Sequence, residues 1–361
     1  MTYFKDYIEC PEPYARRPLP NYEVKPLKQD HIAVCAMQMD TRPIDAGNPE
    51  PGVRANVEHL CEMVEGAMMW PTIAPKQLFC FPEFCLTGLD YAWTRKQWLR
   101  ISIDLEGEEL KRIGRTAKAL RCHIALACHI REQDWPDHYF SASVIVGPQG
   151  TVIHKHWKAI RDPGRLEYAT TVHDVLDEFV ERYGWDAVWP VARTEIGNIA
   201  TYVCSEGFQP ETARVFAFKG AEILVRLIAA GGYNYSETPG IGDSRITMRA
   251  QCIENHCYGI YANSGSWAPQ WISNAMGGSS MIIDPNGNVL KEATSAHETV
   301  VGEVIPIAAF RSRHSIPNLR KELYAPAYAQ YEGKYPPNMF SEYLPEDAVD
   351  AIKYVRRKAR W

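Results

Sequence analysis

The segment from residue 198 to residue 225 constrains the fold of this chain more than any other. Residues 199–203 are apolar and β-prone, which predicts a strand. Pro210 suits the first position of a helix and Gly220 suits its end, and a second apolar run follows at once. The sequence therefore predicts a strand, a helix and a further strand. Cys204 is expected directly after the first strand, where open α/β sheets place their chemistry.

The same alternation of strand and helix extends over most of the chain. Apolar runs predict further strands at residues 31–39, 77–81, 122–129 and 258–262. Apolar residues at helical spacing predict helices at 56–69, 110–120, 173–183 and 245–255, with a proline- and glycine-rich loop at 43–52 before the first of them. Strands that alternate with helices in this way are typical of a layered α/β fold.

Two apolar hairpins share one design. The first covers residues 142–157 around a Gly-Pro-Gln-Gly turn, and the second turns at Asp284-Pro-Asn-Gly287. Because this design recurs late in the chain, we expect an internally duplicated architecture.

The chain divides into one large domain and two extensions. Its 361 residues, 46% of them hydrophobic, are enough to bury a large core. The regular pattern runs from residue 31 to residue 305. Residues 1–30 form either an extended arm over the body or a neighbouring subunit, or a disordered segment. Residues 306–361 are rich in proline, tyrosine and charge and close with a helix-like stretch at 345–360. We expect this extension to pack on a partner subunit.

The charge balance excludes some classes of partner. A net charge of −5 and an isoelectric point near 6.1 argue against nucleic acid or an anionic membrane as the main partner. No stretch approaches the roughly 18 consecutive apolar residues of a membrane helix, and the first residues lack the apolar core of a signal peptide. The sequence therefore predicts a cytoplasmic protein.

Cysteine and histidine patterns do not indicate a metal site. The ten cysteines include no Cys-x-x-Cys pair, and most lie in apolar runs, so we expect small buried core residues. His123, His129 and His138 do not share one face with carboxylates, and no His-Glu-x-x-His motif occurs.

Three predicted strand ends carry residues with complementary chemistry: Glu83, Lys158 and Cys204. A thiol needs a base to become a nucleophilic thiolate, and a nearby cation favours that form. A carboxylate supplies the base, and a lysine stabilises the oxyanion that forms on attack at a carbonyl. The spacing of the three residues in the sequence does not by itself show that they meet.

Five short motifs occur around these residues in a fixed order. They are Phe81-Pro-Glu83, Lys155-His-Trp-Lys158, Cys204-Ser-Glu-Gly-Phe-Gln-Pro-Glu211, Arg249-Ala-Gln-Cys-Ile-Glu254-Asn255 and Asp284-Pro-Asn-Gly287. Together they resemble the nitrilase superfamily of carbon–nitrogen hydrolases, in its amidase-like branch, over about residues 31–305.

The resemblance implies a fold and a set of roles. The fold is a four-layer αββα sandwich that pairs through its helices into a homodimer and often assembles further, here with N- and C-terminal extensions. Family members use no metal or organic cofactor. By the motifs, Glu83 is the catalytic base, Lys158 the oxyanion-binding lysine and Cys204 the nucleophile. Lys155 is the rival for the lysine, and the family pattern favours the later residue.

The family also has a second glutamate in its pocket. Glu167, nine residues after Lys158, resembles the placement in aliphatic amidases and formamidases. Glu178 and Glu181 are the rivals, at a distance that resembles carbamoylases. The amide of Ser205 is expected to bind the oxyanion together with Lys158.

Other residues near the nucleophile allow two readings. Glu206 either binds substrate or caps local backbone amides. Tyr202, Phe208 and Trp267 either line the pocket or fill the core. The long loop at 226–243 is expected to shape the pocket.

The expected function is hydrolysis of a non-peptide C–N bond, with an amide converted to a carboxylic acid and ammonia through a cysteine thioester. True nitrilases commonly have tryptophan directly after the cysteine, and this chain has Ser205. That departure favours an amide or an N-carbamoyl (ureido) compound over a nitrile as the small-molecule substrate. A non-catalytic, partner-binding protein of the same fold is the alternative of another class.

Overall fold

A computed structural model describes residues 20–40, 42, 44–70, 76–161, 167–230, 244–265 and 277–361. Trp267, most of the predicted loop at 226–243 and the first 19 residues of the predicted arm lie outside the described residues. The statements below refer to the described part of the chain.

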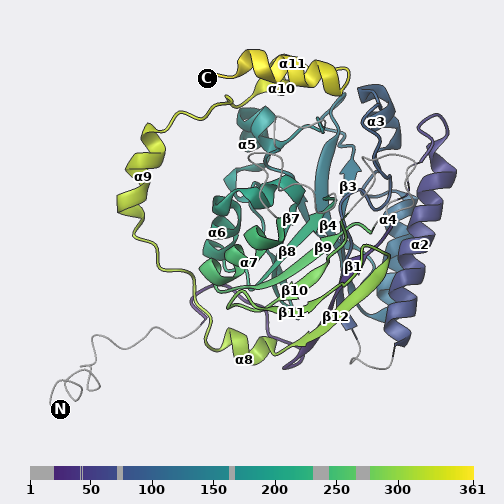
Figure 1. Ribbon diagram of the computed structural model, residues 1–361, viewed down its shortest axis with the longest axis vertical. Coiled ribbons are helices and arrows are strands. Elements are labelled where there is room, and N and C mark those ends of the chain that lie inside the picture. Colours follow the sequence, from purple (N-terminus) through teal and green to yellow (C-terminus); the bar gives the residue numbers. More distant parts are fainter. Residues whose placement is uncertain are drawn as a thin grey trace.

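Two sheets, each of six described strands, form the centre of the molecule (Figure 1). The first sheet has the order β12 (Thr299–Ile305), β1 (Ile32–Gln38), β2 (Lys76–Cys80), β3 (His123–Ile130), β4 (Phe140–Val146) and β5 (Val152–Trp157). The second has the order β11 (Val289–Glu292), β10 (Met281–Ile283), β9 (Tyr258–Asn263), β8 (Ile223–Ile228), β7 (Gly197–Val203) and β6 (Ala192–Thr194).

The two sheets repeat one topology. In the first, β1, β2 and β3 are parallel, β12 is antiparallel to β1, and β4 and β5 form an antiparallel hairpin. In the second, β7, β8 and β9 are parallel, β6 is antiparallel to β7, and β10 and β11 form the hairpin. The expected internal duplication is therefore confirmed.

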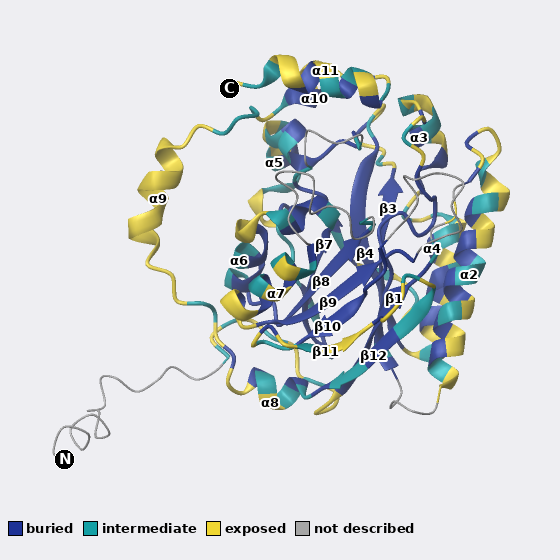
Figure 2. Cartoon of the chain, viewed as in Figure 1, coloured by how far each residue is buried: buried dark blue, intermediate teal, exposed yellow. Residues whose placement is uncertain are grey.

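Helices cover the outer face of each sheet. Figure 1 shows α2 (Pro49–Met69) and α4 (Glu108–Leu120) beside the first sheet, and α6 (Pro210–Phe218) and α7 (Ser244–Asn255) beside the second. Apolar side chains fill three layers: one under each pair of helices and one between the sheets. The central strands are buried, whereas β11 and β12 at one edge of each sheet are partly exposed (Figure 2). This is the predicted αββα sandwich.

The remaining described helices are not part of the two helical layers. They are α3 (Arg95–Ile101), α5 (Leu176–Tyr183), α8 (Ile307–Arg311), α9 (Lys321–Gln330), α10 (Met339–Glu342), α11 (Ala348–Lys358) and the 3-10 turns η2 (Val172–Val175), η3 (Trp185–Ala187) and η4 (Cys204–Phe208).

Some predicted boundaries were wrong. The first helix begins at Pro49, so the end of the predicted loop at 43–52 is helical. Proline is compatible with the first turn of a helix, because the N–H groups there have no partner within the helix. The helix predicted at 173–183 begins as a 3-10 turn and becomes α-helical at Leu176.

The C-terminal extension packs on its own protomer at both ends. Ile307 of α8 belongs to the layer between the sheets, and Phe340 and Val355 of α10 and α11 belong to the layer under α2 and α4. Between these anchors, α9 has no buried residue and lies in an arch of the chain (Figures 1 and 2), which Tyr328 joins to Glu211 of α6 by a hydrogen bond of 2.7 Å. The expected packing of the extension on a partner subunit stays a prediction.

None of the described helices is both long and apolar enough to span a membrane. The cytoplasmic location stays a prediction.

Candidate active site

The ends of three strands bring Glu83, Lys158 and Cys204 together. Lys158 directly follows β5, and its backbone N–H still donates to the Ser141 carbonyl of β4 at 2.8 Å. Cys204 directly follows β7 in the opposite sheet, and Glu83 comes three residues after β2 ends. Lys158 and Glu83 are buried, with exposed fractions of 0% and 2%. The residues therefore meet where the two sheets face each other.

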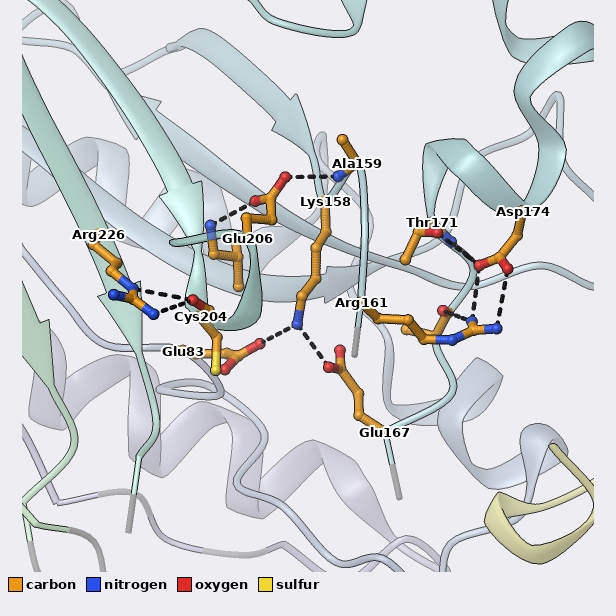
Figure 3. A network of polar contacts seen from close by, with 12 residues as sticks. Glu83, Lys158, Ala159, Arg161, Glu167, Thr171, Asp174, Cys204, Glu206 and Arg226 are labelled. Atoms are coloured by element: carbon orange, nitrogen blue, oxygen red, sulfur yellow. Dashed lines mark hydrogen bonds and ion pairs between the residues drawn. The ribbon is translucent and has the colours of Figure 1, made fainter. Parts of the chain in front are cut away.

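The ammonium group of Lys158 lies between two carboxylates (Figure 3). Its Nζ donates to Oε1 of Glu83 at 3.0 Å and to Oε2 of Glu167 at 2.6 Å. Figure 3 also shows the Cys204 sulfur beside Glu83, and these two side chains form a hydrogen bond. One lysine, two glutamates and the Cys204 thiol thus form one cluster.

Burial and charge set the protonation states of this group. Burial raises the pKa of Glu83 to about 7, against the opposing effect of Lys158. Burial also raises the pKa of the Cys204 thiol to about 12, and the Glu83 charge adds to this rise. For Lys158, burial acts to lower the pKa, but Glu167 and Glu83 outweigh it and hold the pKa above its usual value. The resting site therefore has a protonated thiol beside a carboxylate that titrates near neutral pH.

The second carboxylate has a different environment. Burial alone would raise the pKa of Glu167, but Lys158 outweighs this effect and lowers it. Glu167 is therefore ionised, and its Oε1 is buried without a hydrogen-bond partner in the described structure. The rival Glu178 pairs with Arg182 on the surface of α5, and the rival Lys155 donates to Glu132 at 2.6 Å. Neither rival contacts the group around Lys158.

Glu206 caps backbone amides, which is one of the two predicted readings. Its fully buried carboxylate accepts hydrogen bonds from Val203 N–H at 2.7 Å and from Ala159 N–H at 2.8 Å. It also contacts Nε2 of His156 at 3.0 Å. These contacts occupy the carboxylate, so Glu206 is a structural part of the turn.

Cys204 has a strained backbone. Its φ of +47° lies in the left-handed region, which non-glycine residues adopt only when the surroundings impose it. The next residue, Ser205, is buried, and its hydroxyl has no hydrogen-bond partner among the described residues. The predicted oxyanion donor is the backbone amide of the same residue.

Sequence reasoning missed two residues next to this site. Arg226 is a fully buried arginine in β8 that contacts the backbone of Cys204. Its signal was a charged residue within the apolar run Ile-Leu-Val-Arg-Leu-Ile. From the sequence, the only role examined for His129 is that of a metal ligand, and its place beside Glu167 and Lys158 is not visible there. Burial lowers its pKa to about 4, so it is neutral, and both its ring nitrogens are without partners in the described structure.

Aromatic rings surround His129. The ring centroids of Trp98, Phe84 and Tyr139 lie 4.4, 5.2 and 5.6 Å from that of His129. The charges of Glu167 and Lys158 reach it as well. Of the aromatic residues proposed from the sequence, Tyr202 is a core residue, while Phe208 is partly exposed.

The described cysteines are small core residues, as the sequence predicted, with the exception of Cys204. Every described cysteine is unpaired, and all except Cys204 are buried. Across the described ranges, no group of three or more histidine, cysteine, aspartate or glutamate residues is arranged to hold a metal ion.

Comparisons with known proteins agree with this architecture. The family model described as carbon–nitrogen hydrolase matches residues 31–312. The formamidase of Helicobacter acinonychis (strain Sheeba) is 23% identical over 278 residues, which are 76% of this chain and 74% of the relative. The formamidase of Bacillus thuringiensis (strain Al Hakam) is 25% identical over 243 residues, which are 66% of this chain and 64% of the relative.

Solved structures show the same fold. An amidase from Nesterenkonia sp. superposes with a TM-score of 0.58 at 17% identity, covering 83% of this chain and 98% of that one. A carbon–nitrogen hydrolase from Helicobacter pylori superposes with a TM-score of 0.59 at 17% identity, covering 84% and 96%. This chain belongs to the carbon–nitrogen hydrolases, the nitrilase superfamily. It is a hydrolase of that superfamily, acting on carbon–nitrogen bonds.

Proposed function

We propose that this protein hydrolyses a small amide to a carboxylic acid and ammonia, with Cys204 as nucleophile. The observation that carries the proposal is the ammonium of Lys158 between Glu83 and Glu167, with the Cys204 thiol against Glu83. The formamidase and amidase relatives support an amide substrate. A variant of the Nesterenkonia amidase, 17% identical to this chain, has been solved in complex with acrylamide.

The first half of the reaction forms a thioester. The Glu83 carboxylate takes the thiol proton of Cys204, and the sulfur forms a bond to the amide carbon. The negative charge that develops on the amide oxygen is stabilised by the Lys158 ammonium and the Ser205 N–H. Glu83 then gives its proton to the amide nitrogen. The C–N bond breaks and ammonia leaves.

The second half releases the acid. Glu83 takes a proton from a water molecule, whose oxygen attacks the thioester carbon. The C–S bond breaks, the thiolate recovers the proton from Glu83, and the carboxylic acid leaves. Glu167 keeps Lys158 charged and positioned throughout, and its unpaired Oε1 is available to accept a hydrogen bond from the substrate. The steps as written need no metal and no organic cofactor.

Ammonia release from formamide, short aliphatic amides, ureido acids and nitriles tests the proposal, with Cys204→Ala as the matched control. We expect one mole of ammonia and one of carboxylic acid for each mole of amide, and no turnover by Cys204→Ala. Carbon dioxide released together with the ammonia from a ureido acid would instead identify an N-carbamoyl hydrolase. Turnover that survives Cys204→Ala would overturn the assignment of the nucleophile, and absence of any turnover would favour a non-catalytic protein.

We further propose that the chain forms a homodimer in which the exposed apolar side chains of α9 pack on the second copy. A ten-residue helix is marginal in water without a packing partner. Leu323 and Tyr328 of α9 are nevertheless 72% and 59% exposed. The groove of about 920 Å³ between the arch of α9 and the body is lined by Phe208 and Val215, among other residues.

Light scattering coupled to gel filtration tests the dimer. Leu323→Asp should shift the protein towards the monomer, because it places a charge where an apolar contact is expected. Met69→Asp is the matched control, since Met69 is also exposed but lies at the end of α2 on the other side of the molecule (Figure 1). A wild-type monomer at all concentrations would contradict the dimer.

A further inference from the structure

Arg226 is a buried charge that has no carboxylate partner among the described residues. It lies in β8 with no exposed surface, and no described acidic residue forms an ion pair with it. Its guanidinium group also lies over the ring of Phe208, with Cζ 4.7 Å from the ring centroid. An arginine buried without a counter-charge is costly, so its retention needs a reason.

The contacts of Arg226 concentrate on the nucleophile. Nε and Nη2 both donate to the carbonyl oxygen of Cys204, at 3.0 and 2.8 Å. Nη1 donates to the carbonyl of Ser244 at 3.0 Å and to Oγ1 of Thr247 at 2.8 Å, both in α7. The guanidinium is therefore clamped between helix α7 and the turn that carries Cys204.

Gly207, in the turn η4 that carries Cys204, lies directly against the guanidinium group of Arg226. A Cβ atom on Gly207 would lie 2.3 Å from Nε of Arg226 and 2.4 Å from its Cζ, which is closer than such atoms can approach. The absence of a side chain at this position is thus a requirement for the contact between Arg226 and Cys204.

Arg226 approaches Cys204 from the side opposite to Lys158. Alternate residues of a strand point to the same face of the sheet, so Arg226 shares a face with Leu224 and Ile228 of β8. These two residues pack in the layer under the helices of the second sheet. In Figure 3, Arg226 lies on one side of Cys204 and Lys158 lies on the other. Because the C=O and N–H of a trans peptide point in opposite directions, the N–H of Ser205 is directed away from Arg226.

The geometry points to Arg226 as a positioning residue that orients and polarises the Cys204–Ser205 peptide, so that the Ser205 N–H stabilises the oxyanion of the reaction. This inference rests on the function proposed above. Two charge-assisted hydrogen bonds fix the carbonyl in direction and hold the strained φ of Cys204. They also withdraw electron density from the peptide, and this strengthens its N–H as a donor.

Arg226→Lys tests the inference, because lysine keeps the charge but not the two-pronged geometry. We expect kcat to fall about tenfold or more with little change in KM, since the lost interaction acts mainly in the transition state. The affinity for an aldehyde that forms a hemithioacetal with Cys204 should fall in parallel. Alkylation of Cys204 by chloroacetamide needs a thiolate but no amide oxyanion, so its rate should stay within about threefold of wild type.

Two more variants keep the test decisive. Gly207→Ala displaces the guanidinium without removing it and should reproduce the loss of kcat and of aldehyde affinity. Arg311→Lys is the matched control, because Arg311 is also buried but binds Glu222 at the other end of the strands. It should lower thermal stability while kcat of the folded enzyme stays at the wild-type value.

The outcomes separate the inference from the proposed function. If Arg226→Lys and Gly207→Ala keep wild-type kcat, Arg226 does not position the oxyanion donor. If alkylation falls as much as kcat, the arginine acts on the thiol, and the inference is equally wrong. Lack of amide turnover by the wild-type protein would instead refute the function itself.

Discussion

The carboxylate of Glu206 accepts a hydrogen bond from the backbone amide of Ala159 at 2.8 Å. Ala159 directly follows Lys158, and Glu206 belongs to the turn of Cys204. Because Glu206 also binds the amide of Val203, just before the cysteine, one carboxylate ties the two halves of the site together (Figure 3). The relative position of thiol and ammonium therefore depends on a residue that contacts neither.

Glu206→Gln should impair both stability and catalysis. A carboxylate has only acceptors, whereas glutamine must turn its NH₂ group towards a backbone N–H. An unsatisfied buried group costs about 1–3 kcal/mol, which thermal unfolding will show. We also expect a drop in kcat, because the spacing of Lys158 and Cys204 loosens. Glu222→Gln, a buried glutamate far from Cys204, should lower stability alone. If Glu206→Gln keeps the wild-type kcat, the hydrogen bonds of Glu206 to Val203 and Ala159 are not needed for catalysis.

The rate should depend on the ionisation of Glu83. Its pKa is raised to about 7 by burial, and only the ionised form accepts the thiol proton. The value of kcat/KM should therefore fall below about pH 7, approaching a tenfold loss for each further pH unit. A pH profile measured between pH 5 and 9 shows this limb. A flat profile across the range would exclude Glu83 as the titrating base.

Glu167→Gln should move this acid limb to lower pH. The negative charge of Glu167 raises the pKa of Glu83, so its removal lowers that pKa. The plateau value of kcat should fall as well, because Lys158 loses its 2.6 Å partner. Glu178→Gln is the control, since Glu178 pairs only with Arg182 on the surface of α5. If the fall of kcat/KM at low pH moves to higher pH in Glu167→Gln, the charge of Glu167 does not raise the pKa of Glu83.

Local patterns placed Glu83, Lys158 and Cys204 at the ends of predicted strands, and the family resemblance favoured Lys158 over Lys155. Apolar runs precede Glu83 and Cys204, a hairpin strand precedes Lys158, and the structure brings all three residues together. The duplicated hairpins likewise gave the right topology. These features depend on residues that are close together in the sequence, so they could be predicted from the sequence alone.

Long-range contacts were not predictable in this way. Arg226 and Ala159 meet the turn of Cys204 only after two sheets have packed together. Strand β12 was missed because its partner β1 lies at the other end of the domain. The ends of the C-terminal extension bury apolar residues that are too widely spaced in the sequence to indicate a core.

The anchor of the C-terminal extension should govern stability without affecting catalysis. Glu222 is fully buried and accepts hydrogen bonds from Nε and Nη2 of Arg311, each at 2.7 Å, and from Tyr22 at 2.8 Å. Arg311→Met removes the cation and leaves a buried unpaired carboxylate, which costs about 3–5 kcal/mol. Denaturant unfolding should show that loss, while kcat of the folded protein stays unchanged, because Glu222 lies at the amino end of β8 and Cys204 follows the carboxyl end of β7. Adding Glu222→Gln should recover part of the stability, since it removes the unpaired charge. If the double variant is less stable than Arg311→Met alone, the carboxylate charge is not the source of the loss.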